Sequence, residues 1–132
     1  MKNPLVFLGG TCNGSKWRDE LIPLLSIDYF NPLVEDWTPA CQAEEIRQRE
    51  TADYVLYVIT PEMKGVYGIA KLIEDSIKRP HKTLIVGLRY YGGKEFDDDQ
   101  WKSLNSVLRM ADDNGALVFG GLHQVAYFLG QR

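Results

Sequence analysis

A short apolar run near the middle of the chain constrains the fold more than any other feature. Residues 54–59, Tyr-Val-Leu-Tyr-Val-Ile, are β-branched or aromatic apart from one leucine. The run is too short for a buried helix and is typical of a strand covered on both faces. Thr60-Pro61 ends it, because proline cannot donate to a sheet ladder. A loop with Gly65 and Gly68 follows, and then a helical pattern over residues 69–78. Open α/β sheets bind their ligands where parallel strands end in this way.

The same alternation of strand and helix recurs along the whole chain. Further strands are predicted at residues 4–8, 27–30, 83–87 and 116–119, and further helices at about 16–25, 39–50, 100–112 and 122–129. Ser15, Thr38 and Asp97 are the expected caps of three of these helices, and residues 88–96 are expected to form a loop. We therefore predict an α/β fold, a single doubly wound five-stranded parallel sheet, Rossmann-like or flavodoxin-like, with helices on both faces.

The composition describes an ordinary globular chain. Its 132 residues suggest one domain over residues 1–132, and a net charge of −3 gives no electrostatic reason to expect a nucleic-acid partner. Cys12 and Cys41 make neither a zinc cluster nor a disulfide framework, so we expect a reducing, cytoplasmic setting. We also expect no metal and no cofactor. No apolar run approaches the ~20 residues of a membrane span. The first residues lead into a predicted strand rather than a signal peptide.

The loop after the first predicted strand is rich in glycine. Its residues 9–14, Gly-Gly-Thr-Cys-Asn-Gly, could place backbone amides around a phosphate or sugar at a helix N-terminus. The loop is neither a GxGxxG fingerprint nor a P-loop, since no Gly-Lys-Ser/Thr follows. The glycines could equally serve only to turn the chain into the helix.

Cys12 and Arg18 in this region match a Cys-x5-Arg pattern. That spacing suits a thiolate nucleophile in a phosphate-binding loop, with the arginine holding the anion. It resembles the pattern that low-molecular-weight tyrosine phosphatases carry after their first strand. The resemblance ends there, because no Ser or Thr follows Arg18 and bulky Trp17 stands where the loop must curl. A phosphatase is therefore the weakest functional hypothesis.

The helix predicted at 69–78 has one apolar and one charged face. The charged positions, at helical spacing, are Lys71, Glu74, Asp75 and Lys78. The sequence favours a solvated face with Lys71–Glu74, Lys71–Asp75 and Glu74–Lys78 ion pairs, each worth a few tenths of a kcal/mol.

Several segments together resemble the nucleoside 2-deoxyribosyltransferase superfamily. They are residues 6–10 with Trp17, residues 29–32 with Asp36 and Trp37, residues 52–59, and residues 65–76. Their order and spacing cover most of the chain. The resemblance implies a nucleoside or nucleotide as ligand and no cofactor.

In that family, a glutamate on the first turn of the helix after the third strand attacks C1′ of a deoxyribonucleoside. A covalent glycosyl-enzyme forms, and another base or water then takes the sugar. This chemistry needs a carboxylate near a developing oxocarbenium ion. In relatives that read Ile-Ala-Glu, the nucleophile falls at Lys71 here. A protonated lysine cannot replace a carboxylate nucleophile, so the sequence leaves open whether the chain cleaves the bond or only binds the ligand.

Three glutamates are the candidates to supply the missing carboxylate. Glu74 lies about one turn beyond Lys71, roughly 5 Å along the helix axis. Glu62 follows the third strand. Glu45 lies on the preceding helix, where the resemblance places an acidic residue that helps position the substrate.

The ligand contacts implied by the resemblance come from the strand ends. They are Gly9, Gly10 and Thr11 for the sugar or phosphate, Trp17 and Tyr67 for the base, Asn31 and Glu45 for hydrogen bonds, and Gly68 and Lys71 at the helix start. Either aromatic residue could instead belong to the core. A lysine near a helix N-terminus also suits an anionic phosphate, which favours the alternative of a non-catalytic binder of a nucleotide-type ligand.

Members of the family are commonly homo-oligomers, in which a neighbour's C-terminal segment completes the site. Residues 125–129, Val-Ala-Tyr-Phe-Leu, are compatible with such an interface or with covering their own sheet. The expected partners are thus a small nucleoside or nucleotide and further copies of the chain, with neither nucleic acid nor a membrane.

Overall fold

One parallel sheet forms the centre of the protein. The computed structural model describes residues 3–12, 14–33 and 38–131. The strands are β1 (Leu5–Gly10), β2 (Asp28–Phe30), β3 (Tyr54–Ile59), β4 (Thr83–Gly87) and β7 (Leu117–Phe119). They lie in the order β2-β1-β3-β4-β7, and each neighbouring pair is parallel. This order is the flavodoxin-like one, so the predicted fold class is confirmed.

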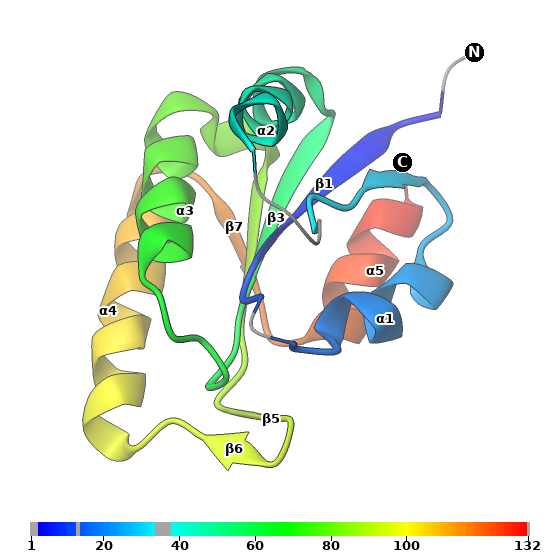
Figure 1. The fold of residues 1–132 in the computed structure, drawn as a ribbon. Coiled ribbons are helices and arrows are strands. Elements are labelled where there is room, and N and C mark those ends of the chain that lie inside the picture. The colour runs from blue at the N-terminus through cyan, green and yellow to red at the C-terminus, as the bar shows by residue number, and fades with distance from the viewer. Residues whose placement is uncertain (1–2, 13, 34–37, 132) are drawn as a thin grey trace.

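Five α-helices cover the two faces of the sheet (Figure 1). On one face lie α2 (Pro39–Thr51), α3 (Tyr67–Lys78) and α4 (Asp98–Asp113), and on the other lie α1 (Trp17–Leu21) and α5 (Leu122–Gly130). The chain first moves from β1 outward to β2 and then returns across β1 to β3. Because crossover connections are right-handed, this reversal puts α1 on the face opposite α2.

The central strand β3 divides the core into two layers. Val55, Tyr57 and Ile59 face the layer that contains α3 and α4, whereas Leu56 and Val58 face the layer of α1 and α5. All five side chains are buried. The strand predicted at 54–59 therefore has the predicted bounds and the predicted cover on both faces.

Two of the three expected helix caps are confirmed. The Thr38 hydroxyl accepts a hydrogen bond from the Cys41 amide at the start of α2, and Asp97 forms a capping box with Gln100 at the start of α4. The expectation for Ser15 is wrong, because Lys16 precedes α1 and no side chain caps that helix. The Ser15 hydroxyl instead donates to Glu62 Oε1 at 2.6 Å.

Other stretches also differ from the sequence-based expectation. The first strand was predicted to end at residue 8, but β1 runs on to Gly10. The helix predicted at 16–25 ends early, as α1 passes into the 3₁₀ helix η1 (Ile22–Leu24), because Pro23 has no N–H to donate. The loop predicted at 88–96 contains a small hairpin of β5 (Tyr90–Tyr91) and β6 (Lys94–Glu95). Its turn residues Gly92 and Gly93 both have positive φ, which suits a two-residue hairpin loop. A second 3₁₀ helix, η2 (Pro80–Lys82), precedes β4.

The apolar C-terminal segment covers its own sheet. Val125, Ala126 and Leu129 of α5 are buried in the core layer shared with α1, and only Tyr127 among the large residues of the segment is well exposed. Of the two roles considered for residues 125–129, the structure shows this one. Among the described helices, none is long and apolar enough to cross a membrane.

A substitution at Gly10 tests how closely the neighbouring strands β1 and β3 must approach each other. Gly10 has φ +115°, and a Cβ there would lie 2.2 Å from the carbonyl oxygen of Val58. We expect Gly10→Ala to lower the free energy of unfolding by about 2 kcal/mol or more, through backbone strain and overlap with β3. Urea unfolding measures this. The matched variant Gly120→Ala, which has open space around it, should be nearly neutral. Equal effects would contradict the account.

Candidate functional site

The candidate site lies where the sheet reverses its strand order. In this fold, β1 and β3 are neighbours whose following connections leave on opposite faces, and a crevice opens at their carboxyl ends. Thr11 ties the two ends together. Its amide donates to the Val58 carbonyl at 2.8 Å, and its hydroxyl accepts from the Thr60 amide at 2.9 Å. The floor of the crevice is therefore fixed by hydrogen bonds that the main chain and side chain of Thr11 make with the end of β3.

Trp17 and Arg18 hold the loop after β1 in place through hydrogen bonds to main-chain carbonyls. Trp17 Nε1 donates to the Thr11 carbonyl at 2.7 Å, and Arg18 donates to the carbonyls of Leu8 and Thr11 at 3.1 and 2.9 Å. Both side chains are buried, and burial lowers the pKa of Arg18 from its ordinary value. Trp17 thus takes the core role of the two considered for it and is not placed to stack on a ligand.

Two cavities border the crevice. The first, of about 220 Å³, lies between the loop after β1 and the first turn of α3, and its walls include the predicted contacts Gly10, Thr11, Tyr67, Gly68 and Lys71. The second, of about 360 Å³, lies between the end of β2 and the start of α2, and its walls include Asn31 and Glu45. The structure thus brings seven of the predicted site residues to two adjacent hollows.

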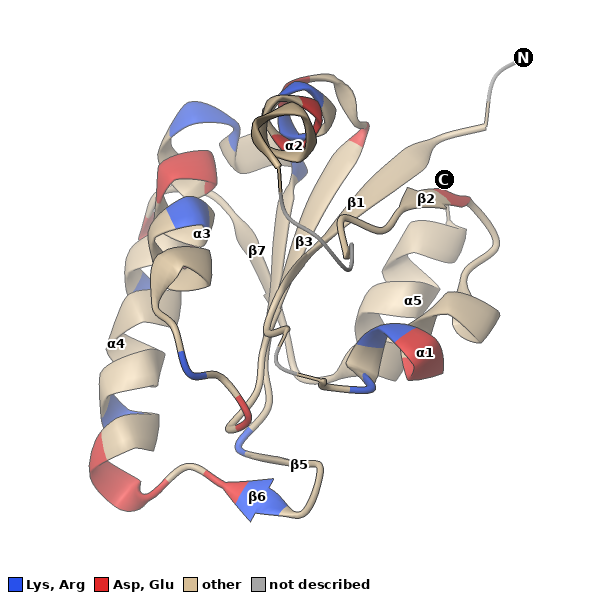
Figure 2. Cartoon of the chain, viewed as in Figure 1, with Lys and Arg blue, Asp and Glu red and all other residues tan. Residues whose placement is uncertain are grey.

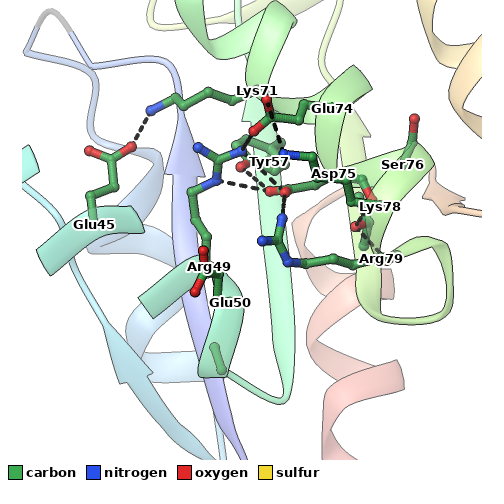
Figure 3. A network of polar contacts seen from close by, with 12 residues as sticks. Glu45, Arg49, Glu50, Tyr57, Lys71, Glu74, Asp75, Ser76, Lys78 and Arg79 are labelled. Carbon is green, nitrogen blue, oxygen red and sulfur yellow. Dashed lines mark hydrogen bonds and ion pairs between the residues drawn. The ribbon is translucent and has the colours of Figure 1, made fainter. Parts of the chain in front are cut away.

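An ion pair connects the two cavities. Glu45 on α2 accepts a hydrogen bond from the ammonium group of Lys71 on α3. Both side chains are largely buried, with 9% and 16% of their surfaces exposed. The Lys71 ammonium also lies 5.0 Å from the centre of the Tyr67 ring, within range of a cation–π contact. Figure 3 shows the pair reaching across the gap between the two helices.

A second set of ion pairs lies one helical turn further along both helices. Arg49 of α2 donates to Asp75 at 3.1 Å and to Glu74 at 2.7 Å. Asp75 is completely buried and also accepts from Arg79 and from the Tyr57 hydroxyl (Figure 3). Burial opposes the charge of Arg49, but its contacts with Asp75 outweigh that effect and raise the pKa of Arg49. Burial, together with the charge of Asp75, raises the pKa of Tyr57, so Tyr57 remains a donor.

These contacts make a charged seam between α2 and α3, which we define as Glu45–Lys71 and Arg49–Asp75. The acid lies on α2 in the first pair and on α3 in the second. Figure 2 shows basic and acidic positions following one another along α3. Opposite polarity in the two pairs disfavours any shift of one helix along the other, because a shift of one turn would bring like charges together.

Comparison with known proteins shows the family of the chain. A family model described as "Nucleoside 2-deoxyribosyltransferase like" matches residues 3–89, which is more than half of the chain. The chain belongs to this family. Searches of curated proteins and of solved structures found no match. The matched span runs from β1 past β4 and contains every candidate residue of the deoxyribosyltransferase-like site.

Of the three candidate glutamates, Glu45 is the one that lines either of the two cavities described above. Glu74 is half exposed and bonds to Arg49. Glu62 accepts from Ser15, and its carboxylate lies against Gly92 of the hairpin. The two therefore face protein groups outside the two cavities.

The remaining residues predicted to contact the ligand do not lie in one place. Gly9 lies within β1, where a Cβ would come within 2.7 Å of the Tyr57 ring, so Gly9 packs inside the sheet. Asn31 borders the second cavity, but its side-chain oxygen also accepts from the Leu33 amide at 3.1 Å. Asp36 and Trp37, and most of the loop predicted at 33–36, lie outside the described residues.

The sequence interpretation of α3 needs one correction. Its charged face was expected to be solvated, with Lys71 paired to Glu74 and Asp75. The Glu74–Lys78 pair is present at 3.7 Å, but Lys71 pairs with Glu45, and Asp75 is buried against Arg49. Each of these partners lies 26 positions away in sequence. The same separation of 26 positions in both pairs is the one sequence signal that could have suggested that α2 and α3 face each other.

Cys41 is a cavity residue that the sequence interpretation did not assign to the site. It lines the second cavity from the first turn of α2. The Thr38 hydroxyl donates to its sulfur at 3.2 Å, and this hydrogen bond lowers the pKa of the Cys41 thiol. Within the described ranges, no cluster of His, Cys, Asp and Glu has the arrangement of a metal site.

Asp75 tests the energetic role of the charged seam. We expect Asp75→Asn to lower the free energy of unfolding by about 3 kcal/mol or more, because the buried charge of Arg49 would keep only the half-exposed Glu74 as a counter-ion. Denaturant unfolding monitored by circular dichroism measures the loss. The matched variant Glu74→Gln removes a half-exposed partner of the same arginine and should cost less than about 1 kcal/mol. Equal losses would show that burial of Asp75 is not decisive.

Proposed function

We propose that the chain binds a nucleoside or nucleotide in the two cavities and acts on its N-glycosidic bond through Glu45. One observation supports this most. The family resemblance implies a carboxylate at position 71, and the lysine found there is bonded to a buried carboxylate from the neighbouring helix. A carboxylate is thus present beside the expected position, although it comes from α2 instead of α3.

The reaction follows from the charge that develops on the sugar. When the bond between C1′ and the base nitrogen breaks, its electron pair leaves with the base, which takes up a proton. The sugar becomes oxocarbenium-like, and a nearby carboxylate stabilises it by charge or by a covalent bond at C1′. Water or a second base then bonds to C1′ and gives up a proton, which balances the proton taken up by the departing base. Glu45 is the carboxylate for this step, with the hydrogen bond from Lys71 orienting it before the ligand arrives.

A second candidate function is binding without catalysis, and Lys71 favours it. The start of α3 has no side-chain cap and no acidic residue in its first turn. An anionic group in the smaller cavity would therefore meet the positive end of the helix and the Lys71 ammonium. Such a group would compete with Glu45 for Lys71, and no bond would need to break.

The phosphatase alternative has less support. Arg18 directs two of its nitrogen atoms to the main-chain carbonyls of Leu8 and Thr11, and those donors do not face a ligand. Full hydrolysis of an aryl phosphate by Cys12→Ser would dispose of this alternative. If the unaltered chain hydrolyses an aryl phosphate and Cys12→Ser loses that activity completely, the result would support the phosphatase alternative.

The first prediction concerns Glu45 as the reacting carboxylate. With pooled deoxynucleosides and a labelled free base, mass spectrometry should detect either labelled nucleoside or released base. Glu45→Gln should slow this turnover by about a hundredfold or more, because it removes the charge that stabilises the sugar cation. Glu74→Gln and Glu62→Gln change the same chemical group outside the cavities and should retain turnover. Loss in Glu74→Gln with retention in Glu45→Gln would reverse the assignment.

The second prediction separates the binding function from the catalytic one. Lys71→Glu should weaken the binding of a deoxynucleoside 5′-monophosphate by about tenfold or more, since it places a negative charge where the phosphate would lie. Isothermal titration calorimetry measures the affinity. Lys78→Glu makes the same charge change near the far end of α3 and should leave affinity nearly unchanged. Unaltered affinity in Lys71→Glu would exclude Lys71 as the anion contact.

A further inference from the structure

The strand β7 forms one free edge of the sheet. It pairs with β4 on one side, and no strand among the described residues pairs with it on the other. Its apolar side chains Leu117 and Val118 are 42% and 39% exposed. An edge strand of this kind offers unpaired N–H and C=O groups together with apolar surface, which is a template for adding another strand.

A stripe of α4 borders this edge. Asn105, Leu108, Arg109 and Asp112 line a hollow of about 490 Å³ together with Val118. These four positions recur at helical spacing, so they share the side of α4 that faces the β7 edge. Figure 1 shows α4 running along the face of the sheet that ends at β7. The strand edge and the helix stripe form one continuous surface.

This surface carries one basic and one acidic side chain that have no ion-pair partner among the described residues. Arg109 and Asp112 lie three residues apart on α4, yet neither forms an ion pair with another residue in the part of the chain that the structure describes. Arg109 and Asp112 are both exposed, and a basic and an acidic group on the same side of a helix are complementary to the same side of an antiparallel copy. The surface therefore matches a copy of itself.

We propose that two copies of the chain associate through β7 and this stripe of α4 about a twofold axis. An axis perpendicular to the sheet sets the two β7 strands side by side in antiparallel orientation and joins the two sheets into one. The same rotation keeps both α4 helices on one face, antiparallel to each other. Arg109 of one copy then meets Asp112 of the other, and the reverse pair forms by symmetry.

The surface of β7 and α4 is a better interface for a second copy of the chain than the C-terminal segment 125–129. Apart from the exposed Tyr127, the apolar side chains of residues 125–129 are buried or partly buried on their own sheet, so this segment offers little further apolar area to a neighbour. Val118 and Leu117 lie at the sheet edge, where pairing would cover them. The interface also lies outside the span that matches the family, residues 3–89, and the proposal does not depend on the proposed function.

Charge reversal tests the interface, with sedimentation velocity giving the mass in solution. The unaltered chain should be a dimer at low salt. Arg109→Asp and Asp112→Arg should each weaken the dimer roughly tenfold or more, because each turns two attractive pairs into two repulsive ones. Mixing these two variants should restore association, since every pair across the mixed dimer is again of opposite charge. Native mass spectrometry identifies that mixed dimer.

Lys16→Asp provides the matched control, because Lys16 is exposed beside α1 and the substitution changes the net charge by the same amount as Arg109→Asp. It should leave the dimer intact. A monomeric unaltered chain at all concentrations would overturn the proposal and leave the edge to another partner. A dimer that both single variants preserve, or variants that fail to associate when mixed although circular dichroism shows them folded, would overturn it as well.

Discussion

The ion pair between Arg49 and Asp75 is the interaction on which the candidate site depends. The only buried side chains of α2 are Glu45 and Arg49, and both are charged. The helix is therefore held against α3 by ion pairs more than by apolar packing. Burying a charge is costly unless a partner compensates it, so each pair is stable only when the helices are correctly aligned. The seam contributes precise placement more than it contributes stability.

This placement explains how the site can be assembled without a compact sequence motif. The sheet provides the crevice at the ends of β1 and β3, and Thr11 fixes its floor. The helix α3 provides Lys71, and α2 provides Glu45 from the opposite wall. Because Arg49 lies one turn beyond Glu45 on the same helix, the buried pair with Asp75 also sets the position of the Glu45 carboxylate. A family member that lacks glutamate at position 71 thereby keeps a carboxylate within the crevice.

The sequence predicted the fold in detail where local patterns decide it. The bounds of β3 and β4 agree with the predicted ones, because a run of buried apolar residues ended by Thr60-Pro61 or Gly87 leaves little choice. The site was predicted only in part. The helical pattern places Asp75 on the solvated face of α3. Such a pattern cannot show that Asp75 is buried against Arg49, which lies 26 positions away. Trp17 had two possible roles, and its burial beneath the loop after β1 depends on packing that one sequence does not specify.

The most direct test of the central claim is to map where a ligand binds in solution. Titration of the isotopically labelled protein with deoxynucleosides and their 5′-monophosphates, followed by amide chemical shifts, would locate the site. The account predicts shifts at Gly10 to Cys12, at the first turn of α3 and around Glu45, with smaller changes elsewhere. Shifts confined to other surfaces, such as the hollow of about 830 Å³ that Ile69 of α3 and Leu104 of α4 help to line, would contradict the claim that the charged seam builds the ligand site.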